Sequence, residues 1–242
     1  MLSHYDPAQL LFQLGEIVTQ RVYLRHGVEV RAGDTVLDVG ANVGVAAAFF
    51  ATECKAGIVH SFEPVPPLFE LLRENARHFP ACIPHDYGIS SAARRASIAY
   101  YPKAAAMSGL YAEPEQDRER VRTYLINSGM PEDDAAHELD GRYRSVTFPC
   151  ELRTLSMVVR EESIEQVDLL KIDVEKSELD VLEGIDGGDW PRFRQLVVEV
   201  HDEDDRCARI SEMLTARGFS PTVEQEPMWQ GTGMYMVYAT RR

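Results

Sequence analysis

A short apolar run that ends in a glycine-rich turn constrains the fold of this chain more than any other feature. Residues 36–39 read Val-Leu-Asp-Val, and residues 40–44 read Gly-Ala-Asn-Val-Gly. A continuous apolar run is typical of a parallel strand that is covered on both faces. The glycines let the backbone turn tightly and let a ligand lie against the main chain. In open α/β sheets, ligands bind at the carboxyl ends of the strands, so this turn is the first candidate binding site.

The rest of the chain repeats the strand-then-helix unit. We expect strands at residues 35–39, 57–62, 81–89, 96–101, 167–172, 195–200, 221–225 and 234–239, and helices at residues 45–55, 67–79, 177–185 and 206–217. This alternation predicts a Rossmann-like, doubly wound α/β fold with a mostly parallel sheet. No helix separates the last two strands, which predicts an antiparallel last strand.

The 242 residues suffice for one α/β domain with an insertion, so residues 1–242 are interpreted as a single domain. Asp6 and Pro7 resemble a helix cap followed by proline, which predicts a helical segment within residues 1–30. Residues 111–148 interrupt the strand–helix rhythm with a charged stretch. Long insertions near a ligand cleft are often functional, so we expect a helical lid there that selects the acceptor and docks its carrier.

Composition and charge exclude several classes of partner. The formal net charge of −14 disfavours binding to nucleic acid or to an anionic membrane, since both require a cationic surface. No secretory leader is visible, and no apolar run approaches the roughly 20 residues that span a bilayer. The four cysteines form no CxxC pair, so the spacing typical of a zinc site is absent. The sequence therefore predicts a soluble cytoplasmic protein.

Two acidic residues at predicted strand ends indicate the kind of ligand. Asp38 precedes the glycine turn, where it would repel a phosphate but suits a ligand with a cationic aminoacyl end. The turn also lacks the GxGxxG pattern of dinucleotide-binding folds. Glu63 ends the next strand, about 20 residues beyond the turn, where an acid can accept both hydroxyls of a ribose.

Four segments resemble the FkbM family of methyltransferases over about residues 30–238. They read VLDVGANVG, SFEPVPPLFELLRENA, LLKIDVEKSELDVLEGI and LVVEVHD. The resemblance implies a class I methyltransferase fold and an O-methyltransferase of natural-product or glycan pathways. It also implies S-adenosylmethionine as the cofactor, with the adenine near Asp86, Tyr87 and Gly88. The other implied cofactor-binding residues are Asp38, Gly40, Asn42, Gly44 and Glu63.

One departure from the usual family pattern indicates which branch of the family this chain resembles. The usual pattern has glycine after the KIDVE glutamate, whereas this chain has Lys176. Together with Asp189, Trp190 and residues 198–202, this resembles a branch found in polyketide, nonribosomal peptide and antibiotic biosynthesis. That branch implies a hydroxylated acceptor that is either a small molecule or bound to a carrier protein, such as a hydroxymalonyl unit.

Four polar residues at two strand ends are candidates for the chemistry. Asp173 and Glu175 follow one strand on the same side, and Glu199 and His201 do the same at the next. Methylation of an alcohol needs a base, so Asp173, Glu175 and a neutral His201 are the catalytic candidates. Alternatively, Asp173, Glu199 and His201 hold Mg²⁺ or another divalent metal that orients the acceptor. The sequence is consistent with both a general base and a divalent metal at these residues.

Two other functions fit a fold of this type. One is an NAD(P)-dependent oxidoreductase, against which Asp38 and the missing third glycine count. The other is a non-catalytic cofactor-binding scaffold, which would not require both Asp38 and Glu63.

Overall fold

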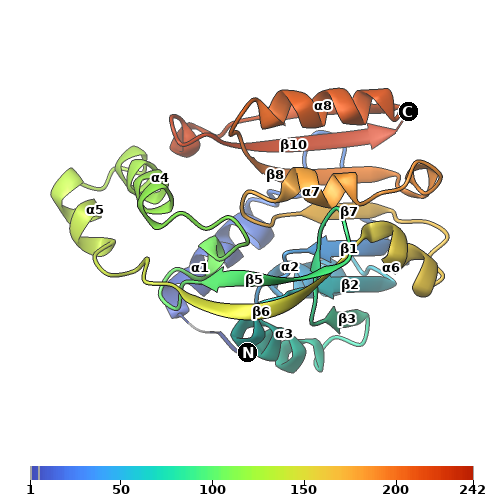
Figure 1. The fold of residues 1–242 in the computed structure, drawn as a ribbon, viewed down its shortest axis with the longest axis horizontal. Coiled ribbons are helices and arrows are strands. Elements are labelled where there is room, and N and C mark those ends of the chain that lie inside the picture. The colour runs from blue at the N-terminus through green and yellow to red at the C-terminus, as the bar shows by residue number, and fades with distance from the viewer. Residues whose placement is uncertain (1, 5, 242) are drawn as a thin grey trace.

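A seven-stranded sheet organises the chain, whose computed structural model describes residues 2–4 and 6–241 (Figure 1). The strand order is β3-β2-β1-β7-β8-β10-β9. Its strands are β1 (Thr35–Val39), β2 (Ile58–Phe62), β3 (Cys82–His85), β7 (Leu169–Ile172), β8 (Gln195–His201), β9 (Phe219–Glu224) and β10 (Met234–Arg241). β10 runs antiparallel to both of its neighbours, and the other pairings are parallel. The doubly wound fold and the antiparallel last strand are confirmed.

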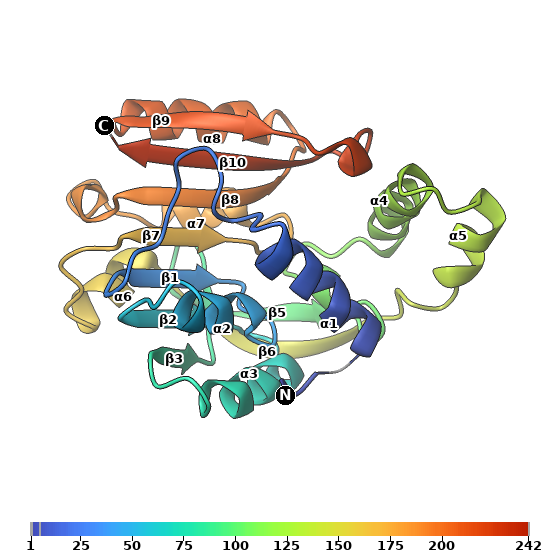
Figure 2. The ribbon, with the colours of Figure 1, turned by 180° about the vertical axis from the view of Figure 1, so that it is seen from behind.

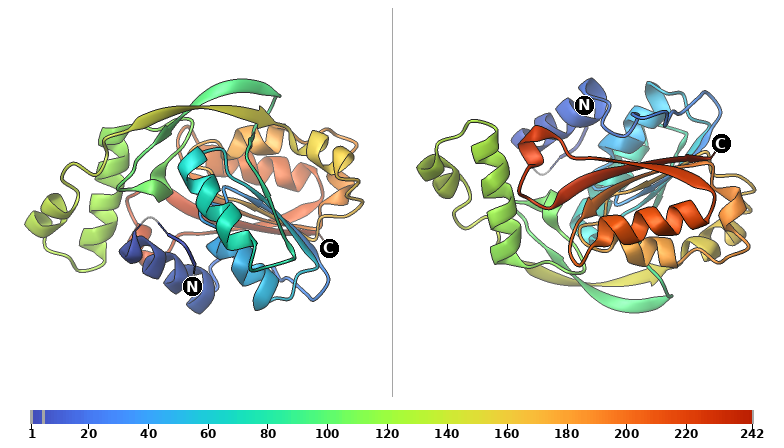
Figure 3. Two further views of the ribbon diagram at one scale, coloured as in Figure 1. Left: turned by 90° about the horizontal axis from the view of Figure 1, so that it is seen from below. Right: turned by 90° about the horizontal axis from the view of Figure 1, so that it is seen from above.

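Helices cover both faces of this sheet, as the edge-on views of Figure 3 show. One face carries α2 (Val45–Thr52) and α3 (Pro66–Ala76), and the other carries α6 (Leu155–Glu161), α7 (Glu178–Glu183) and α8 (Arg206–Ala216). Successive residues of β1 alternate between the two cores. Val36 packs in one buried cluster and Leu37 in the other. A strand that is apolar on both sides is therefore required here.

A second, three-stranded sheet corrects part of the expected strand pattern. It contains β4 (Gly88–Ile89), β5 (Arg94–Tyr100) and β6 (Val146–Arg153) in the order β4-β6-β5. The strand expected at residues 81–89 is two strands in different sheets, since His85 pairs with Phe62 and Gly88 with Leu152. The strand expected at residues 96–101 belongs to this second sheet, and β6 and α6 were not predicted.

The expected insertion contains two helices, α4 (Pro114–Asn127) and α5 (Glu132–Glu138). They stand apart from the main sheet at one end of the molecule, as both ribbon views show (Figures 1 and 2). A small separate core packs Leu139 and Tyr143 against Tyr101 and Ala104. The insertion thus has buried apolar residues of its own.

The N-terminal segment forms α1 (Pro7–Leu14) and continues into a π-helical turn at Gly15–Thr19. The Asp6 side chain accepts a hydrogen bond of 2.8 Å from the Ala8 amide, as expected of a helix cap. α1 crosses the carboxyl-end side of the strands in the rear view (Figure 2). Within the described part of the chain, no helix is both long and apolar enough to cross a membrane.

Candidate functional site

A cavity opens at the carboxyl ends of β1, β2, β7 and β8, with an empty volume of about 1190 Å³, part of it open to solvent. The walls near the glycine turn include Val39, Gly40, Asn42, Phe62, Glu63, Leu68, Gly88, Ile89, Ile98 and Leu152. The opposite walls include Gln9, Phe12, Gln13, Glu16, Tyr23, residues 105–110, Asp173, Glu175, Glu199, Trp229 and Met234. The position matches the one expected for a ligand in an open α/β sheet.

The glycine turn has the backbone that its sequence predicts. Gly40 has a φ of 78°, and a Cβ there would lie 1.7 Å from the carbonyl oxygen of Asp173. Asn42 adopts a φ of 51°, and its side-chain oxygen accepts a hydrogen bond from the Val43 amide. Gly40 and Asn42 line the cavity, whereas Gly44 caps α2 behind it with a φ of 89°. The turn therefore presents main chain, rather than side chains, to a ligand.

Glu63 lies where a ribose-binding acid is expected. It lines the cavity, and its two carboxylate oxygens accept 2.9 Å hydrogen bonds from the amides of Asn42 and Val65. Burial raises the pKa of Glu63 to about 7, although both amide hydrogen bonds oppose that shift. Each oxygen retains a lone pair, so the carboxylate can still accept hydroxyl donors.

The expected adenine region is only partly on the cavity wall. Gly88 lines the cavity together with Ile89. Asp86 is exposed and Tyr87 lies outside the cavity, where its ring centroid is 4.9 Å from the guanidinium of Arg153. The strand expected through this region is broken between β3 and β4, and Asp86 and Tyr87 lie in the break.

Asp38 is not on the cavity wall. Its side chain is fully buried, and its Oδ1 lies 3.0 Å from Nζ of Lys171, the residue opposite it on β7. Lys171 also donates a 2.7 Å hydrogen bond to the carbonyl oxygen of Gly40. Burial acts to lower the pKa of Lys171, but the charges of Asp38 and Asp173 outweigh burial and raise it. The pair therefore supports the glycine turn from below.

Asp173 does face the cavity, as expected. Its Oδ2 accepts a 2.8 Å hydrogen bond from the hydroxyl of Tyr23 and lies 3.6 Å from Nζ of Lys171. Tyr23 comes from the segment between α1 and β1, which thereby fixes the orientation of the carboxylate.

His201 is held between two carboxylates and does not line the cavity. Its Nδ1 lies 2.8 Å from Oε1 of Glu178, and its Nε2 lies 3.0 Å from Oε2 of Glu175. Burial acts to lower the pKa of His201, but the charges and hydrogen bonds of both glutamates outweigh burial and raise it to about 10. The two glutamates therefore favour the protonated imidazolium, in contrast to the neutral imidazole expected from the sequence.

Glu199 and Glu16 add carboxyl groups to the cavity wall. Burial is the main cause that raises the pKa of Glu199 well above its usual range, and the charges of Asp173 and Glu175 add to it. Burial and the nearby Glu226 raise the pKa of Glu16 to about 8. Both groups therefore bind protons more tightly than an exposed glutamate does.

The residues that are close enough together to hold a metal ion differ from the expected set. Glu175, Glu199 and His201 each offer one ligand atom, and these atoms lie within 4.8 Å of one another. Glu175 thus takes the place expected for Asp173, whose carboxylate is held by Tyr23 instead.

Several residues of the site were not predicted. Lys171 holds the buried Asp38 carboxylate, while Phe12, Trp229 and residues 105–110 form the wall opposite the glycine turn. Lys171 left a signal in the sequence, because a lysine inside an apolar parallel strand needs a buried partner. The other residues left none, since they approach the cavity from segments far apart in the chain.

Comparison with known proteins gives concordant results. Residues 38–221 match the family described as "Methyltransferase FkbM domain". The chain is 39% identical over 242 residues to 31-O-demethyl-FK506 methyltransferase FkbM of Streptomyces tacrolimicus, covering 99% of this chain and 93% of that protein. It is also 36% identical over 240 residues to AMB antimetabolite synthetase AmbE of Pseudomonas aeruginosa, covering 93% of this chain but 11% of that protein.

One solved structure supports the fold. The crystal structure of Methyltransferase FkbM from Methylobacillus flagellatus KT matches with a TM-score of 0.56 at 15% identity. The match covers 90% of this chain and 46% of that one. Similarity at this level of identity establishes the shared fold.

Proposed function

Because the chain belongs to the FkbM methyltransferase family, we propose that it transfers a methyl group from S-adenosylmethionine to a hydroxyl of a natural-product intermediate. One observation carries the choice of cofactor. Five acidic residues line the cavity (Glu16, Glu63, Asp173, Glu175 and Glu199), and none of the described lining residues is Lys, Arg or His. Such a cavity offers no cation to the phosphates of a dinucleotide, whereas a cationic ligand is attracted by these carboxylates and stabilises their ionised form.

Each part of the cofactor has candidate partners on the wall. Glu63 would accept the ribose hydroxyls, and the turn of Gly40 and Asn42 would hold the aminoacyl portion. Gly88 and Ile89 would contact the adenine. Asp38 contributes indirectly, through Lys171 and the carbonyl oxygen of Gly40. When bound, the cofactor supplies a methyl group on a positively charged sulfur.

Glu199 is the residue we assign as general base. It lines the cavity beside Asp173, and its raised pKa makes it a stronger proton acceptor than an exposed glutamate once it is ionised. Asp173, which is oriented by the Tyr23 hydroxyl, accepts a hydrogen bond that positions the acceptor. His201 keeps its proton and orients Glu175.

A metal at Glu175, Glu199 and His201 is the alternative. The donor set suits a divalent cation, because Glu178 holds Nδ1 of His201 and Nε2 faces the carboxylates. A proton satisfies the same nitrogen, and a proton and a cation cannot occupy Nε2 together. Since the pKa of His201 is about 10, we propose the proton. EDTA should then leave methyl transfer unchanged, whereas loss of activity that Mg²⁺ or Mn²⁺ restores would establish the metal.

The acceptor is inferred from the wall opposite the glycine turn. Phe12, Leu110, Trp229 and Met234 form an apolar surface next to the carboxylates, which suits a carbon skeleton that carries a hydroxyl. The similarity to part of a synthetase supports an acceptor from an assembly pathway, either free or bound to a carrier protein.

The insertion offers few unpaired cations for carrier docking. Arg122 is paired with Glu119 and Glu132, and Arg118 contacts the carbonyl oxygen of Ala136. The insertion is therefore proposed as an acceptor-selecting lid, and these contacts leave few of its cations free to bind an acidic carrier protein.

Two measurements test this function. Thermal shift with S-adenosylmethionine, S-adenosylhomocysteine and NADH identifies the cofactor, because a ligand that binds only the native state raises the midpoint. Intact-mass screening of hydroxylated small molecules and carrier-bound acyl groups then detects a methyl gain. Stabilisation by NADH alone would support an oxidoreductase. Cofactor binding without any methylated acceptor would support a non-catalytic scaffold.

A further inference from the structure

The turn after β7 has an unusual backbone. Glu175 and Lys176 have φ values of 49° and 72°, so two successive residues with side chains adopt the left-handed region. Glycine occupies this region readily, whereas other residues pay a steric cost. Lysine at position 176 is therefore unfavourable for the backbone, and its side chain must compensate.

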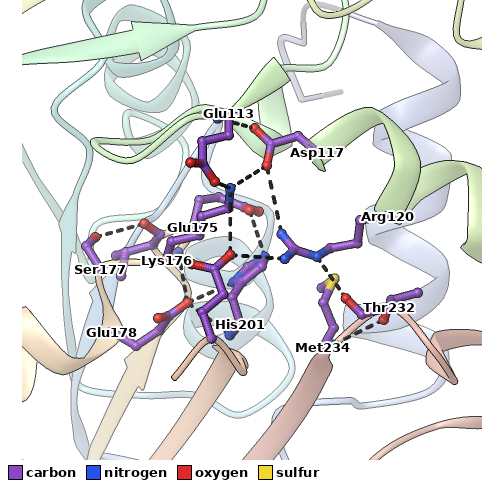
Figure 4. A network of polar contacts seen from close by, with 12 residues as sticks. Glu113, Asp117, Arg120, Glu175, Lys176, Ser177, Glu178, His201, Thr232 and Met234 are labelled. Atoms are coloured by element: carbon purple, nitrogen blue, oxygen red, sulfur yellow. Dashed lines mark hydrogen bonds and ion pairs between the residues drawn. The ribbon is translucent and has the colours of Figure 1, made fainter. Parts of the chain in front are cut away.

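The Lys176 side chain is buried in contact with the insertion. Only 4% of the residue is exposed, and its Nζ lies 2.8 Å from Oδ1 of Asp117 and 3.2 Å from Oε2 of Glu113. Figure 4 shows the ammonium reaching from the turn toward these carboxylates of α4 and the residue before it. Glu203, at 3.8 Å, completes the group.

Asp117 is the buried end of this contact, with an exposure of 1%. Its Oδ2 accepts hydrogen bonds from the Tyr101 hydroxyl at 3.0 Å and the Glu113 amide at 2.9 Å. Arg120, one turn along α4, donates to the carbonyl oxygen of Thr232 at 3.0 Å and contacts Glu203 at 3.3 Å. The first half of α4 is thus fixed to the main domain through charged groups.

The segment that leads into α4 passes over the same turn. A Cβ at Gly109 would lie 2.9 Å from Cβ of Glu175 and 3.0 Å from its carbonyl oxygen. Gly109 belongs to residues 105–110, which line the cavity opposite the glycine turn. Packing at Gly109 and the ion pair at Asp117 therefore hold both ends of this connection against residues 175 and 176.

We propose that Lys176 is a positioning residue that holds the insertion closed over the acceptor end of the cavity. The ammonium fixes α4, α4 fixes residues 105–110, and these residues form the acceptor wall. The identity of this wall rests on the proposed function. We call the contact of Lys176 with Asp117 and Glu113 the clamp. The cofactor half of the cavity does not depend on the clamp, because Gly40 and Glu63 lie on the opposite wall.

The chain offers a matched control for the test. Lys55 has a φ of 59° and is exposed, so Lys55→Gly relieves the same kind of backbone strain without removing a buried ion pair. Lys176→Gly relieves the strain and removes the clamp. Asp117→Asn removes the charge at the other end while an oxygen remains for Tyr101.

We expect Lys176→Gly and Asp117→Asn each to raise the acceptor KM by about tenfold, with a smaller change in kcat and unchanged affinity for S-adenosylhomocysteine. Combining them should add little, since both remove one interaction. Amide hydrogen exchange in α4 should become faster in both variants. Lys55→Gly should match wild type in all these measurements.

Unchanged exchange in α4 and unchanged acceptor KM in Lys176→Gly would overturn the clamp. Equal losses of acceptor and cofactor affinity would also overturn it, because they indicate a general structural role. The exchange measurement needs no acceptor, so it distinguishes failure of the clamp from failure of the proposed function. If no hydroxylated acceptor is methylated but α4 exchanges faster in Lys176→Gly, the proposed function fails and the clamp stands.

Discussion

Replacing Lys171 with methionine should destabilise the protein strongly. The Asp38 side chain is fully buried and Lys171 is 2% exposed, with 3.0 Å between their charged groups. Methionine matches the length of lysine but leaves the Asp38 carboxylate buried without a counter-charge. Breaking a buried pair in this way typically lowers the free energy of unfolding by about 3–5 kcal/mol. For a chain of this size the midpoint of thermal unfolding should fall by roughly 6–20 °C.

The double variant Asp38→Asn with Lys171→Met separates the cost of the orphaned charge from that of lost packing. It removes both charges, so we expect it to recover most of the stability that Lys171→Met loses. Lys103→Met, at an exposed position, controls for the substitution itself. Urea unfolding gives the free energies, provided that the slope with denaturant is the same for all variants.

The same variants test how the pair supports the glycine turn. Lys171 donates to the carbonyl oxygen of Gly40, so both the single and the double variant should bind S-adenosylhomocysteine more weakly than wild type. If Lys171→Met lowers the free energy of unfolding by less than about 1 kcal/mol, the reasoning is refuted, because Asp38 would then already be uncharged or hydrated.

Two further predictions concern the cavity wall. Glu63→Gln should weaken S-adenosylhomocysteine binding by roughly 1–3 kcal/mol in calorimetry, since it replaces one acceptor oxygen with a donor. The pKa of Glu63 is raised to about 7, so wild-type affinity should fall as the pH drops below 7 and the carboxylate is protonated, while the variant should lack this dependence. Glu199→Gln should lower kcat in single turnover and leave the affinity for S-adenosylhomocysteine, which lacks the sulfonium charge, unchanged in calorimetry. Full activity in this variant would exclude Glu199 as the base.

The central sheet could be predicted because its signals are local. The apolar run of β1 and the turn at Gly40 specify a strand and its ligand-binding end within nine residues. The second sheet could not be predicted in the same way. β6 is largely exposed and contains Pro149, and it pairs with β5 across a long insertion. Only that non-local pairing identifies it as a strand.

The part of the candidate site that lies at the ends of predicted strands could be predicted from the sequence. Asp173, Glu175 and Glu199 reach the cavity because they lie at the carboxyl ends of two neighbouring parallel strands, Glu199 within β8 itself. The protonation of His201 depends on Glu178, which a helix brings to it, and no spacing in the sequence reveals this contact. Asp38 is directed by its strand pairing toward Lys171 rather than toward the ligand.

The distribution of charge explains why one acidic chain can hold several carboxylates in a single cavity. Asp38 and Glu175 are matched by Lys171 and His201, two cations that lie behind the wall. Burial raises the pKa of Asp38 and Glu175 despite these partners. Glu16 and Glu199 have no such partner among the described ion pairs, and burial raises the pKa of Glu16 to about 8 and that of Glu199 well above its usual range. A cationic ligand lowers the cost of ionising them, so cofactor binding should favour release of their protons. The same ligand that delivers the methyl group would then also prepare the carboxylate that accepts the proton of the alcohol.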